Sequence, residues 1–348
     1  IMLGSSHANA NESTIAGIPE LDQQLVKDFS ELWVHGHDGR IEPVSTLASE
    51  ILRKISRQSS FEGKSADEVI LSMYLYPELW KTVPIVKVSN EQVLLQLGTT
   101  KSRLAITEFF DDAGNYRIAS QVQAAYAKTP VLRNHVDKEF IYVDERVNVC
   151  FMTFKGQMLN LFPTGKTEDA WLVPGSKVSG LPAADSLFVN RGFELLKESV
   201  SGKGTVDPRQ LIATVAAFQE KYAAGLLPTK LHKRVEILYN KFSPFKKVFL
   251  IYLLFGFTLL FVLFVNIFRQ KTINKYLKYI LTGFIVLGFV IHTSGLGLRW
   301  YASGHAPWSN GYESMIYVAW AAMLAGLIFG RKYPMVVGTA SFMAGITL

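Results

Sequence analysis

The stretch Val248-Phe-Leu-Ile-Tyr-Leu-Leu-Phe-Gly-Phe-Thr-Leu-Leu-Phe-Val-Leu-Phe-Val-Asn-Ile-Phe268 contains 21 residues and no charged side chain. As an α-helix that rises about 1.5 Å per residue, it matches the roughly 30 Å of hydrocarbon in a bilayer. The sequence before this stretch is of mixed polarity, whereas charges become rare after it. The stretch therefore predicts an integral membrane protein, in which a polar domain precedes a membrane region over residues 247–348.

Further apolar segments follow the first one. Residues 279–298 and 312–330 are each long enough to span the bilayer, and we expect both to be complete membrane helices. Residues 335–348 would extend only about 21 Å as a helix, which is shorter than the hydrocarbon layer. We expect them to be a truncated fourth membrane helix.

Residues 11–246 have the signals of a helical domain, so the predicted fold class is mainly α. Ser65 followed by Glu68 is typical of a capping box at a helix start, and Pro77 is expected to end that helix. Asp207 followed by Pro208 predicts another helix start.

Other segments of this domain have weaker or longer patterns. A long helix is predicted over residues 134–161, and short strand signals occur at residues 85–88 and 93–97. A basic helix that precedes the first membrane span is expected to lie against the membrane surface. Its apolar stripe consists of Leu231, Val235, Leu238 and Phe242.

The charge and the single cysteine exclude several classes of protein. Cys150 is the only cysteine, so the chain has no intrachain disulfide, no Cys-x-x-Cys-His motif and no cysteine-based zinc pattern. The net charge is +7, but the basic residues cluster beside the membrane spans, where such charge is usual. We therefore expect no resident metal and no nucleic-acid partner, and a lipid bilayer as the surrounding medium.

The first ten residues have two interpretations. They end in Ala8-Asn9-Ala10 after an apolar start, which resembles a signal-peptidase site. The alternative is the last turn of a preceding membrane helix. On either interpretation, residues 1–10 are expected to be the remnant of a longer segment.

The short connectors predict the orientation in the membrane. Basic residues lie between the first and second spans, and Arg331 and Lys332 follow the third. Positive charge in short connectors favours the cytoplasmic side. The connector over residues 299–311 contains only Arg299 as a basic anchor and is rich in aromatic residues, so it and the large domain are expected on the outer side, although the basic residues before Val248 favour the opposite orientation.

The densest chemical signal is His292-Thr-Ser-Gly-Leu-Gly-Leu-Arg299-Trp300-Tyr301-Ala-Ser-Gly-His305-Ala-Pro-Trp308-Ser-Asn-Gly-Tyr312-Glu313. Imidazole is a common axial ligand of haem iron, arginine can pair with a propionate, and tryptophan offers a flat face to a porphyrin. An outward-facing haem platform would need all three groups.

Simpler interpretations remain open for each of these residues. The aromatic residues fit an interfacial belt, Arg299 could anchor its helix, and His305 could be an ordinary loop histidine. His292 is expected about one to two turns inside the second span, where ionisable groups are costly and often functional. It could equally be a neutral packing residue, and Glu313 could stabilise the start of the third span.

Residues 298–314 carry a resemblance to a known family. The pattern Leu298-Arg299-Trp300-Tyr301-x-Ser303-Gly304-His305-x-Pro307-x-Ser309-Asn310-x-Tyr312-Glu313-Ser314 resembles the CcsA family of System II cytochrome c biogenesis, and more closely the fused ResB–CcsA synthetases. The preceding domain is similar to that of such fusions at Asp38-Gly-Arg40-Ile-Glu-Pro43-Val-Ser-Thr46-Leu47-Ala-Ser-Glu50 and Asp144-Glu145-Arg146-Val147-Asn148.

The resemblance implies a function in the bacterial inner membrane, with the large domain on the periplasmic side. Such proteins move haem b across the membrane and present it to the Cys-x-x-Cys-His motif of an apocytochrome c, where two thioether bonds form. The resemblance leads us to expect Arg299, His305 and Trp308 to line the haem-handling vestibule, with His292 beneath it.

The family's tryptophan-rich haem segment and its iron-ligating histidines are expected beyond Leu348. No catalytic residue or iron ligand is therefore assigned here, and residues 1–348 alone are expected to be inactive as a haem lyase. Two other classes stay open. One is a membrane transporter without covalent chemistry, in which His292 and Glu313 relay protons or bind an exported solute. The other is a structural assembly factor.

Overall fold

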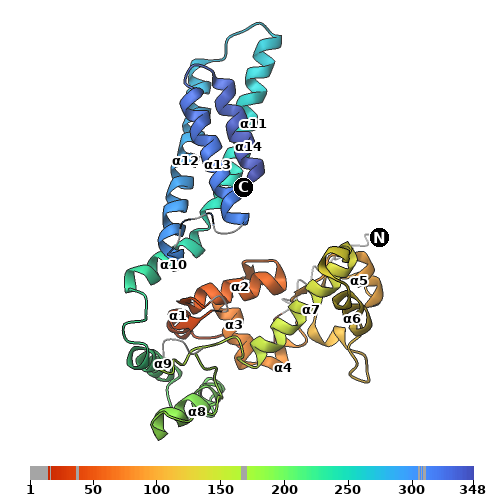
Figure 1. Ribbon diagram of the computed structural model, residues 1–348, viewed down its shortest axis with the longest axis vertical. Coiled ribbons are helices and arrows are strands. Elements are labelled where there is room, and N and C mark those ends of the chain that lie inside the picture. Colours follow the sequence, from red (N-terminus) through yellow and green to blue (C-terminus); the bar gives the residue numbers. More distant parts are fainter. Residues whose placement is uncertain are drawn as a thin grey trace, which may run out of the picture. The chain divides into compact units, whose positions relative to one another are not determined.

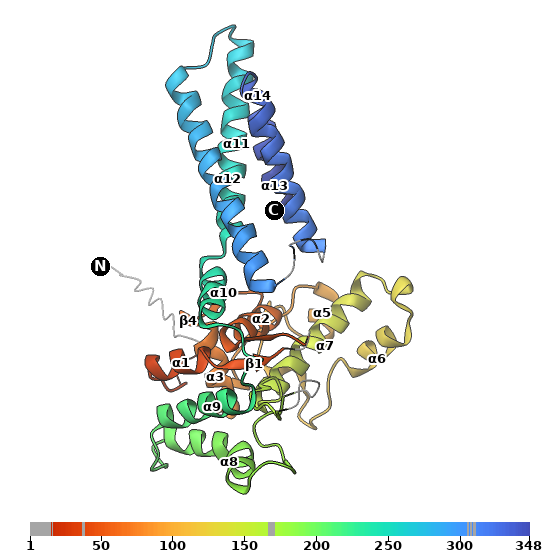
Figure 2. The same ribbon diagram turned by 60° about the vertical axis from the view of Figure 1, so that its left-hand side comes forward.

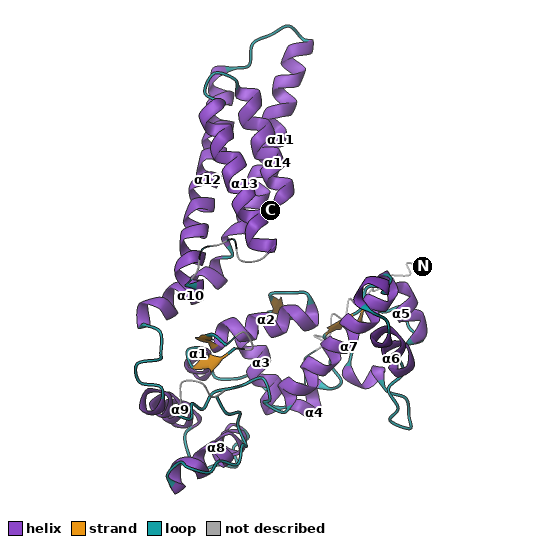
Figure 3. Ribbon diagram, viewed as in Figure 1, coloured by secondary structure: helices purple, strands orange, loops and turns teal. Residues whose placement is uncertain are grey.

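The computed structural model describes residues 15, 17–36, 39–165, 171–304, 306, 308 and 311–348, with the main chain alone at Lys241. The chain divides into two compact units, Ile1–Leu227 and Pro228–Leu348. Both are mainly helical (Figure 1 and Figure 3). Among the described residues, three helices are long and apolar enough to cross a membrane. The mainly α fold class is confirmed.

The first unit is built from short and medium helices, joined by 3-10 turns at Ile106–Phe109 and Pro130–Leu132. Its α-helices are α1 Gln23–Ser30, α2 Val44–Ser56, α3 Ala66–Leu75, α4 Pro77–Trp80, α5 Glu91–Gln96, α6 Ala119–Ala127, α7 His135–Phe154, α8 Ala183–Val200 and α9 Pro208–Tyr222. The predicted helix starts are confirmed. The Ser65 hydroxyl accepts from the Glu68 amide at 3.3 Å, and the Asp207 carboxylate accepts from the Arg209 amide at 2.9 Å.

The strands of the first unit are short and form antiparallel pairs among the described residues. The pairs are β1 Trp33–His35 with β2 Ile41–Pro43, β3 Ser60–Phe61 with β4 Lys64–Ser65, and β5 Val86–Lys87 with β6 Arg103–Leu104. The strand signal at residues 85–88 is confirmed by β5. These pairs are too small to form a layer, so helices supply most of the core.

Two sequence predictions about this unit are wrong. Residues 93–97 do not form a strand: the Asn90 side chain caps the helix α5 by accepting from the amides of Gln92 and Val93. The helix predicted over residues 134–161 ends at Phe154. Gly156 follows in the left-handed conformation, with φ of 70°, and a Cβ there would lie 2.6 Å from the Tyr74 ring.

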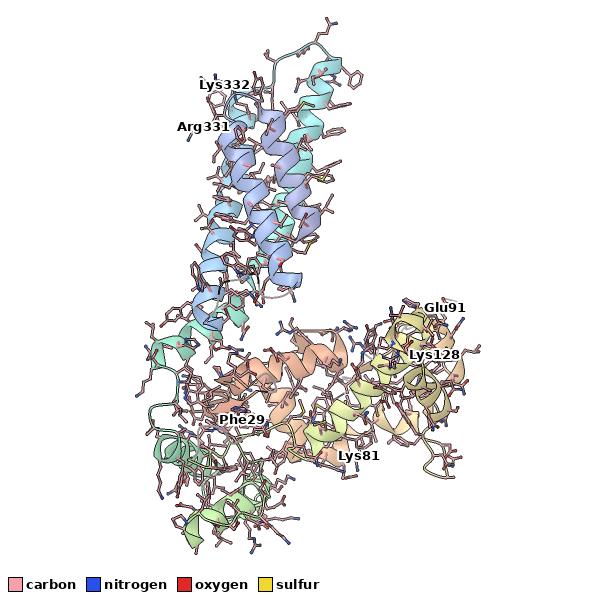
Figure 4. The ribbon with its side chains drawn as sticks, in the orientation of Figure 1. Phe29, Lys81, Glu91, Lys128, Arg331 and Lys332 are labelled. Carbon is pink, nitrogen blue, oxygen red and sulfur yellow. The ribbon has the colours of Figure 1, made fainter. Side chains whose placement is uncertain are left out.

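The core of the first unit lies between α2, α3 and α7, and it includes fully buried Phe29 on α1, which Figure 4 labels. Trp80 is also fully buried, and its indole N–H donates to the Ser72 hydroxyl at 2.9 Å. Burying such large aromatic side chains removes apolar area from water and stabilises the unit.

A buried glutamine connects α9 to the strand β1. The Gln219 side-chain amide donates to the carbonyls of Trp33 and Leu161, at 2.7 and 2.9 Å, and its oxygen accepts from the Trp33 amide at 3.0 Å. One side chain therefore satisfies buried main-chain groups from two distant segments.

Five helices occur in the part of the second unit that the structure describes: α10 Lys230–Phe242, α11 Pro244–Phe268, α12 Lys275–Ser303, α13 Gly311–Phe329 and α14 Pro334–Thr347. The spans predicted at residues 248–268 and 279–298 lie within α11 and α12, and α13 covers all but the last residue of 312–330. The helix α14 is apolar but shorter than the other three. Its partner α11 lies beside it in Figure 2.

Small residues permit the close contact between α11 and α14. A Cβ at Gly256 would lie 2.7 Å from the Phe342 amide nitrogen, and a Cβ at Gly345 would lie 2.9 Å from the Leu253 nitrogen. Gly326 of α13 lies similarly against Ala340 of α14. In lipid, where apolar burial between helices gains little, such backbone proximity is the main source of helix association.

The basic connectors of this unit lie at one end of the bundle. Figure 4 shows Arg331 and Lys332 between α13 and α14, at the same end as the connector that joins α11 to α12. The helix α12 begins at Lys275, beside that connector, and ends at Ser303, so its last turn belongs to the opposite end. Lys246 and Lys247, in the first turn of α11, belong to that opposite end as well, so positive charge occurs at both ends of the bundle.

Candidate functional site

Arg299 lies in the last turns of α12 and joins three helices of the second unit. Its Nε and Nη2 atoms donate to the Glu313 carboxylate oxygen Oε1 at 2.9 and 2.7 Å. Its Nη1 donates to the Tyr239 hydroxyl of α10 at 3.3 Å. The guanidinium carbon also lies 5.7 Å from the centre of the Tyr312 ring. The sequence therefore places a fixed cation at the Ser303 end of the bundle.

Glu313 belongs to the first turn of α13 and is only 1% exposed. A carboxylate so deeply buried needs a compensating cation, and Arg299 supplies it with two hydrogen bonds. The start of a helix also favours negative charge, since the first amides point toward it. Both effects favour an acidic side chain at this position.

His292 lies two turns before Arg299 on α12, or about 10 Å along the helix axis. Its side chain is fully buried between aromatic rings of α11, with centroid distances of 5.6 Å to Phe245 and 5.8 Å to Tyr252. Neither ring nitrogen makes a hydrogen bond of ordinary geometry within the described residues, although the main chain of Ile316 lies near the ring. The Tyr252 hydroxyl is likewise buried without a described partner. Two polar groups thus share one apolar contact region.

Trp308 lies at the protein surface and is 58% exposed. Its ring packs edge-on against Tyr317 at 5.5 Å, and Tyr317 stacks on Trp320 at 5.8 Å. Trp300 and Tyr301 of α12 are also exposed, and with Gly297 and Gly304 they line a shallow cavity of about 380 Å³. Aromatic faces are therefore available at the Ser303 end of the bundle.

The predicted site residues are only partly brought together. Arg299 and His292 occupy one helix, and Trp308 lies in the connector that leads to Glu313. His305 falls outside the described residues, as do Pro307, Ser309 and Asn310 of the same motif. The role of these residues at haem stays a prediction.

Tyr239 is a contact that the sequence analysis missed. For α10 the sequence pattern predicts only an apolar stripe that lies against the membrane surface. The polar residues His232, Glu236 and Tyr239 recur at a spacing of three and four residues, which places them on one other face of the helix. This polar stripe was the sequence signal that could have predicted a contact between α10 and another helix.

The two motifs of the first unit have structural partners. Arg40 is paired with Glu42, and Lys54 of α2 with Glu145 of α7. Buried Arg146 donates to the Lys87 carbonyl at 2.6 Å and to Glu139 at 3.3 Å, which connects α7 to β5. These contacts hold the unit together and do not converge on a cleft.

Other candidate groups in the first unit lack the geometry of a reactive site. Cys150 is fully buried, and burial raises the pKa of its thiol, so it is not poised to react at neutral pH. No cluster of three or more His, Cys, Asp or Glu side chains with metal-binding geometry occurs among the described residues.

The fold and the site thus define a helical membrane protein with an arginine–carboxylate pair beside exposed aromatic rings. No family model matches the chain. It is 33% identical to protein NrfI of Wolinella succinogenes over 330 residues, which is 94% of this chain and 36% of that protein. It therefore spans about a third of the length of NrfI.

Shorter matches involve proteins named cytochrome c biogenesis protein CcsA. The chain is 46% identical over 50 residues to CcsA of Parasynechococcus marenigrum, which covers 14% of this chain and 16% of that protein. It is 42% identical over 67 residues to CcsA of Prochlorococcus marinus strain MIT 9303, covering 19% and 21%. The chain is thus similar to NrfI over most of its own length and to CcsA proteins over short segments.

Proposed function

We propose that this chain is part of a System II cytochrome c synthetase that transports and presents haem b and attaches it covalently to apocytochrome c. The observation that carries the proposal is the Arg299 cluster, an ordered cation beside exposed aromatic rings in a chain similar to CcsA proteins. Haem has anionic propionates on a flat apolar ring, so a site for it needs both kinds of group.

Arg299 is the residue that we propose to contact a propionate. Its hydrogen bonds to Glu313 and Tyr239 hold the guanidinium in place but do not use every N–H that an arginine offers. A second carboxylate can therefore bind without breaking the existing pair. We propose that His305 and Trp308 line the same vestibule and that His292 lies beneath it.

The proposed partner is an apocytochrome c with a Cys-x-x-Cys-His motif. Its two cysteine thiols would add across the two vinyl groups of haem, and each addition forms one thioether bond. The proposed location is the bacterial inner membrane, with residues 11–246 on the periplasmic side, because the short basic connectors favour the cytoplasm. The transporter alternative needs Glu313 free to carry protons, whereas its carboxylate is held by Arg299.

The proposal is tested by the haem content of the full-length protein. Purified protein should show the absorption spectrum of bound haem, and co-expression with a reporter apocytochrome should yield covalent cytochrome c. Arg299→Lys should reduce haem retention per folded protein, and Arg299→Ala should reduce it further, since Lys cannot reproduce the planar fork of hydrogen bonds. Arg269→Ala, in an exposed connector, is the matched control.

His305 provides an independent test. His305→Ala should lower the reporter yield but leave the spectrum of bound haem nearly unchanged, if the axial ligands lie elsewhere. Loss of the low-spin spectrum, restored by added imidazole, would instead make His305 an iron ligand. Two results together would rule out the synthetase function. The purified full-length protein would contain no haem, and the reporter cytochrome would mature equally well in cells that lack the protein.

A further inference from the structure

The helix α10 presents a polar face to its own unit. Tyr239 reaches Arg299 of α12, and the His232 ring lies 5.4 Å from that of Tyr301. Glu236 is 2% exposed and lies 3.7 Å from the His232 Nε2 atom. In a water-soluble bundle a helix would bury its apolar stripe, so this orientation is the reverse of the usual one.

The apolar stripe of α10 faces away from α12. Leu231 is 62% exposed, Leu238 is 56% exposed and Phe242 is 39% exposed within the structure. A left-handed residue, Ser243, separates α10 from Pro244, the first residue of α11. Since α11 is long and apolar enough to cross the bilayer, the exposed stripe occurs directly beside a membrane span.

Basic residues form the edge of the stripe that is remote from α12. At 3.6 residues per turn, Lys230 and Arg234 lie one turn apart, on the opposite side of the stripe from His232 and Glu236. Lys230 and Arg234 are exposed, as are Lys246 and Lys247 in the first turn of α11. The acidic residue of α10, Glu236, is buried on the other face.

We propose that α10 is an interfacial helix that binds anionic phospholipid through Lys230, Arg234, Lys246 and Lys247, with its apolar stripe inserted among the acyl chains. A bilayer of neutral lipid would be enough to bury the apolar stripe. The four exposed cations, in addition, are attracted to anionic headgroups. The membrane thereby holds one face of α10 while Tyr239, on another face, contacts Arg299. This inference does not depend on the proposed haem chemistry.

Insertion of the stripe is tested with an environment-sensitive fluorophore on a single cysteine. Leu238→Cys in a Cys150→Ser background carries the probe, and Val131→Cys, 94% exposed in the first unit, is the control position. The full-length protein is placed in nanodiscs that contain doxyl-labelled phosphatidylcholine. The probe at position 238 should be blue-shifted and quenched, and that at 131 should not. Equal behaviour at the two positions overturns the proposal.

The anionic preference is tested by lipid composition and charge removal. Adding phosphatidylglycerol to phosphatidylcholine nanodiscs should increase quenching at position 238. The double variant Lys230→Gln and Arg234→Gln should lower the insertion equilibrium constant by about twenty-five-fold in anionic discs, at roughly five-fold per neutralised residue. Lys177→Gln with Lys203→Gln, both exposed in the first unit, controls for net charge. Quenching that is insensitive to both lipid and variant overturns the anionic site.

Discussion

Arg299 and Glu313 are 14 residues apart and on different helices, yet two nitrogens of the arginine bind one oxygen of the glutamate. The Glu313 side chain is 1% exposed and that of Arg299 is 24% exposed, so the pair is unequal in its access to solvent. Removing the arginine would leave a buried carboxylate with its main cation gone. Removing both charged side chains would leave no buried carboxylate at position 313.

The first prediction follows from this asymmetry. Arg299→Met should destabilise the protein by about 3 kcal/mol, because it leaves Glu313 charged and buried. Adding Glu313→Gln to that variant should recover part of the loss. The measurement is a double-mutant cycle from unfolding of the detergent-solubilised protein, followed by circular dichroism. Strictly additive losses, within about 0.5 kcal/mol, would show that the two residues do not interact.

The second prediction concerns His292. Its ring nitrogens make no ordinary hydrogen bond among the described residues, so replacing it with an apolar residue should not lower stability. His292→Leu should keep or raise the unfolding midpoint while impairing maturation of a reporter cytochrome c. Phe289→Leu, on the same helix, is the packing control. Normal maturation in His292→Leu would reduce His292 to a packing residue.

The third prediction tests orientation. Ser303→Cys and Lys275→Cys occupy opposite ends of α12, in a Cys150→Ser background. A membrane-impermeant thiol reagent added to intact cells should label position 303 and not position 275. Permeabilised cells should label both, which controls for reactivity. Labelling of position 275 alone would reverse the proposed topology.

The fourth prediction concerns Gln219. Gln219→Leu should destabilise the first unit by roughly 2–5 kcal/mol, because the substitution removes three buried hydrogen bonds to the main chain at Trp33 and Leu161. Gln210→Leu, exposed on the same helix α9, should have little effect. Limited proteolysis of the two variants, compared with wild type, measures the difference. Equal resistance of the Gln219 and Gln210 variants would contradict this account.

The fifth prediction concerns Asp67, in the first turn of α3. Burial raises the pKa of its carboxyl from 3.8 to about 6, and its Oδ1 atom has no hydrogen-bond partner among the described residues. Between these two pKa values the folded protein holds a proton that the unfolded chain releases. Lowering the pH from 7 to 4 should therefore stabilise this region by up to about 3 kcal/mol from this group.

Asp67→Asn removes the titrating group and is the variant to compare. At each pH, hydrogen exchange of α3 peptides is measured in both proteins, so that the intrinsic exchange rate cancels. Wild type should be less protected than Asp67→Asn at pH 7 and should approach it near pH 4. A constant difference across this range would mean that Asp67 keeps an ordinary pKa.

The membrane helices follow directly from composition, because a chain in lipid must satisfy its main-chain hydrogen bonds within each helix. Helix starts at Ser65 and Asp207 were equally legible, since each side chain binds an amide only a few residues away. The end of α7 could not be predicted from the sequence, because it depends on the position of Gly156 against the ring of Tyr74, which is far away in sequence. Local signals predict local contacts.

The candidate site shows the same limit. The sequence marked both Arg299 and Glu313, but their bond to each other depends on how α12 and α13 are rotated. Tyr239 was missed because α10 has two patterned faces, and the apolar one dominated the interpretation. A short apolar run such as residues 93–97 fits a strand or a helix equally well. The Asn90 side chain, which accepts a hydrogen bond from the Gln92 amide, caps the helix that forms there.

The glycine contacts between α11 and α14 bear on the order in which the protein is made. The helix α11 leaves the ribosome before α12 and α13, yet its closest neighbour, at Gly256 and Gly345, is the later helix α14. Until α14 is inserted, this groove on α11 must be filled by lipid or by the insertion machinery. A ribosome that stalls before Pro334 therefore leaves α11 without the helix that contacts it at Gly256.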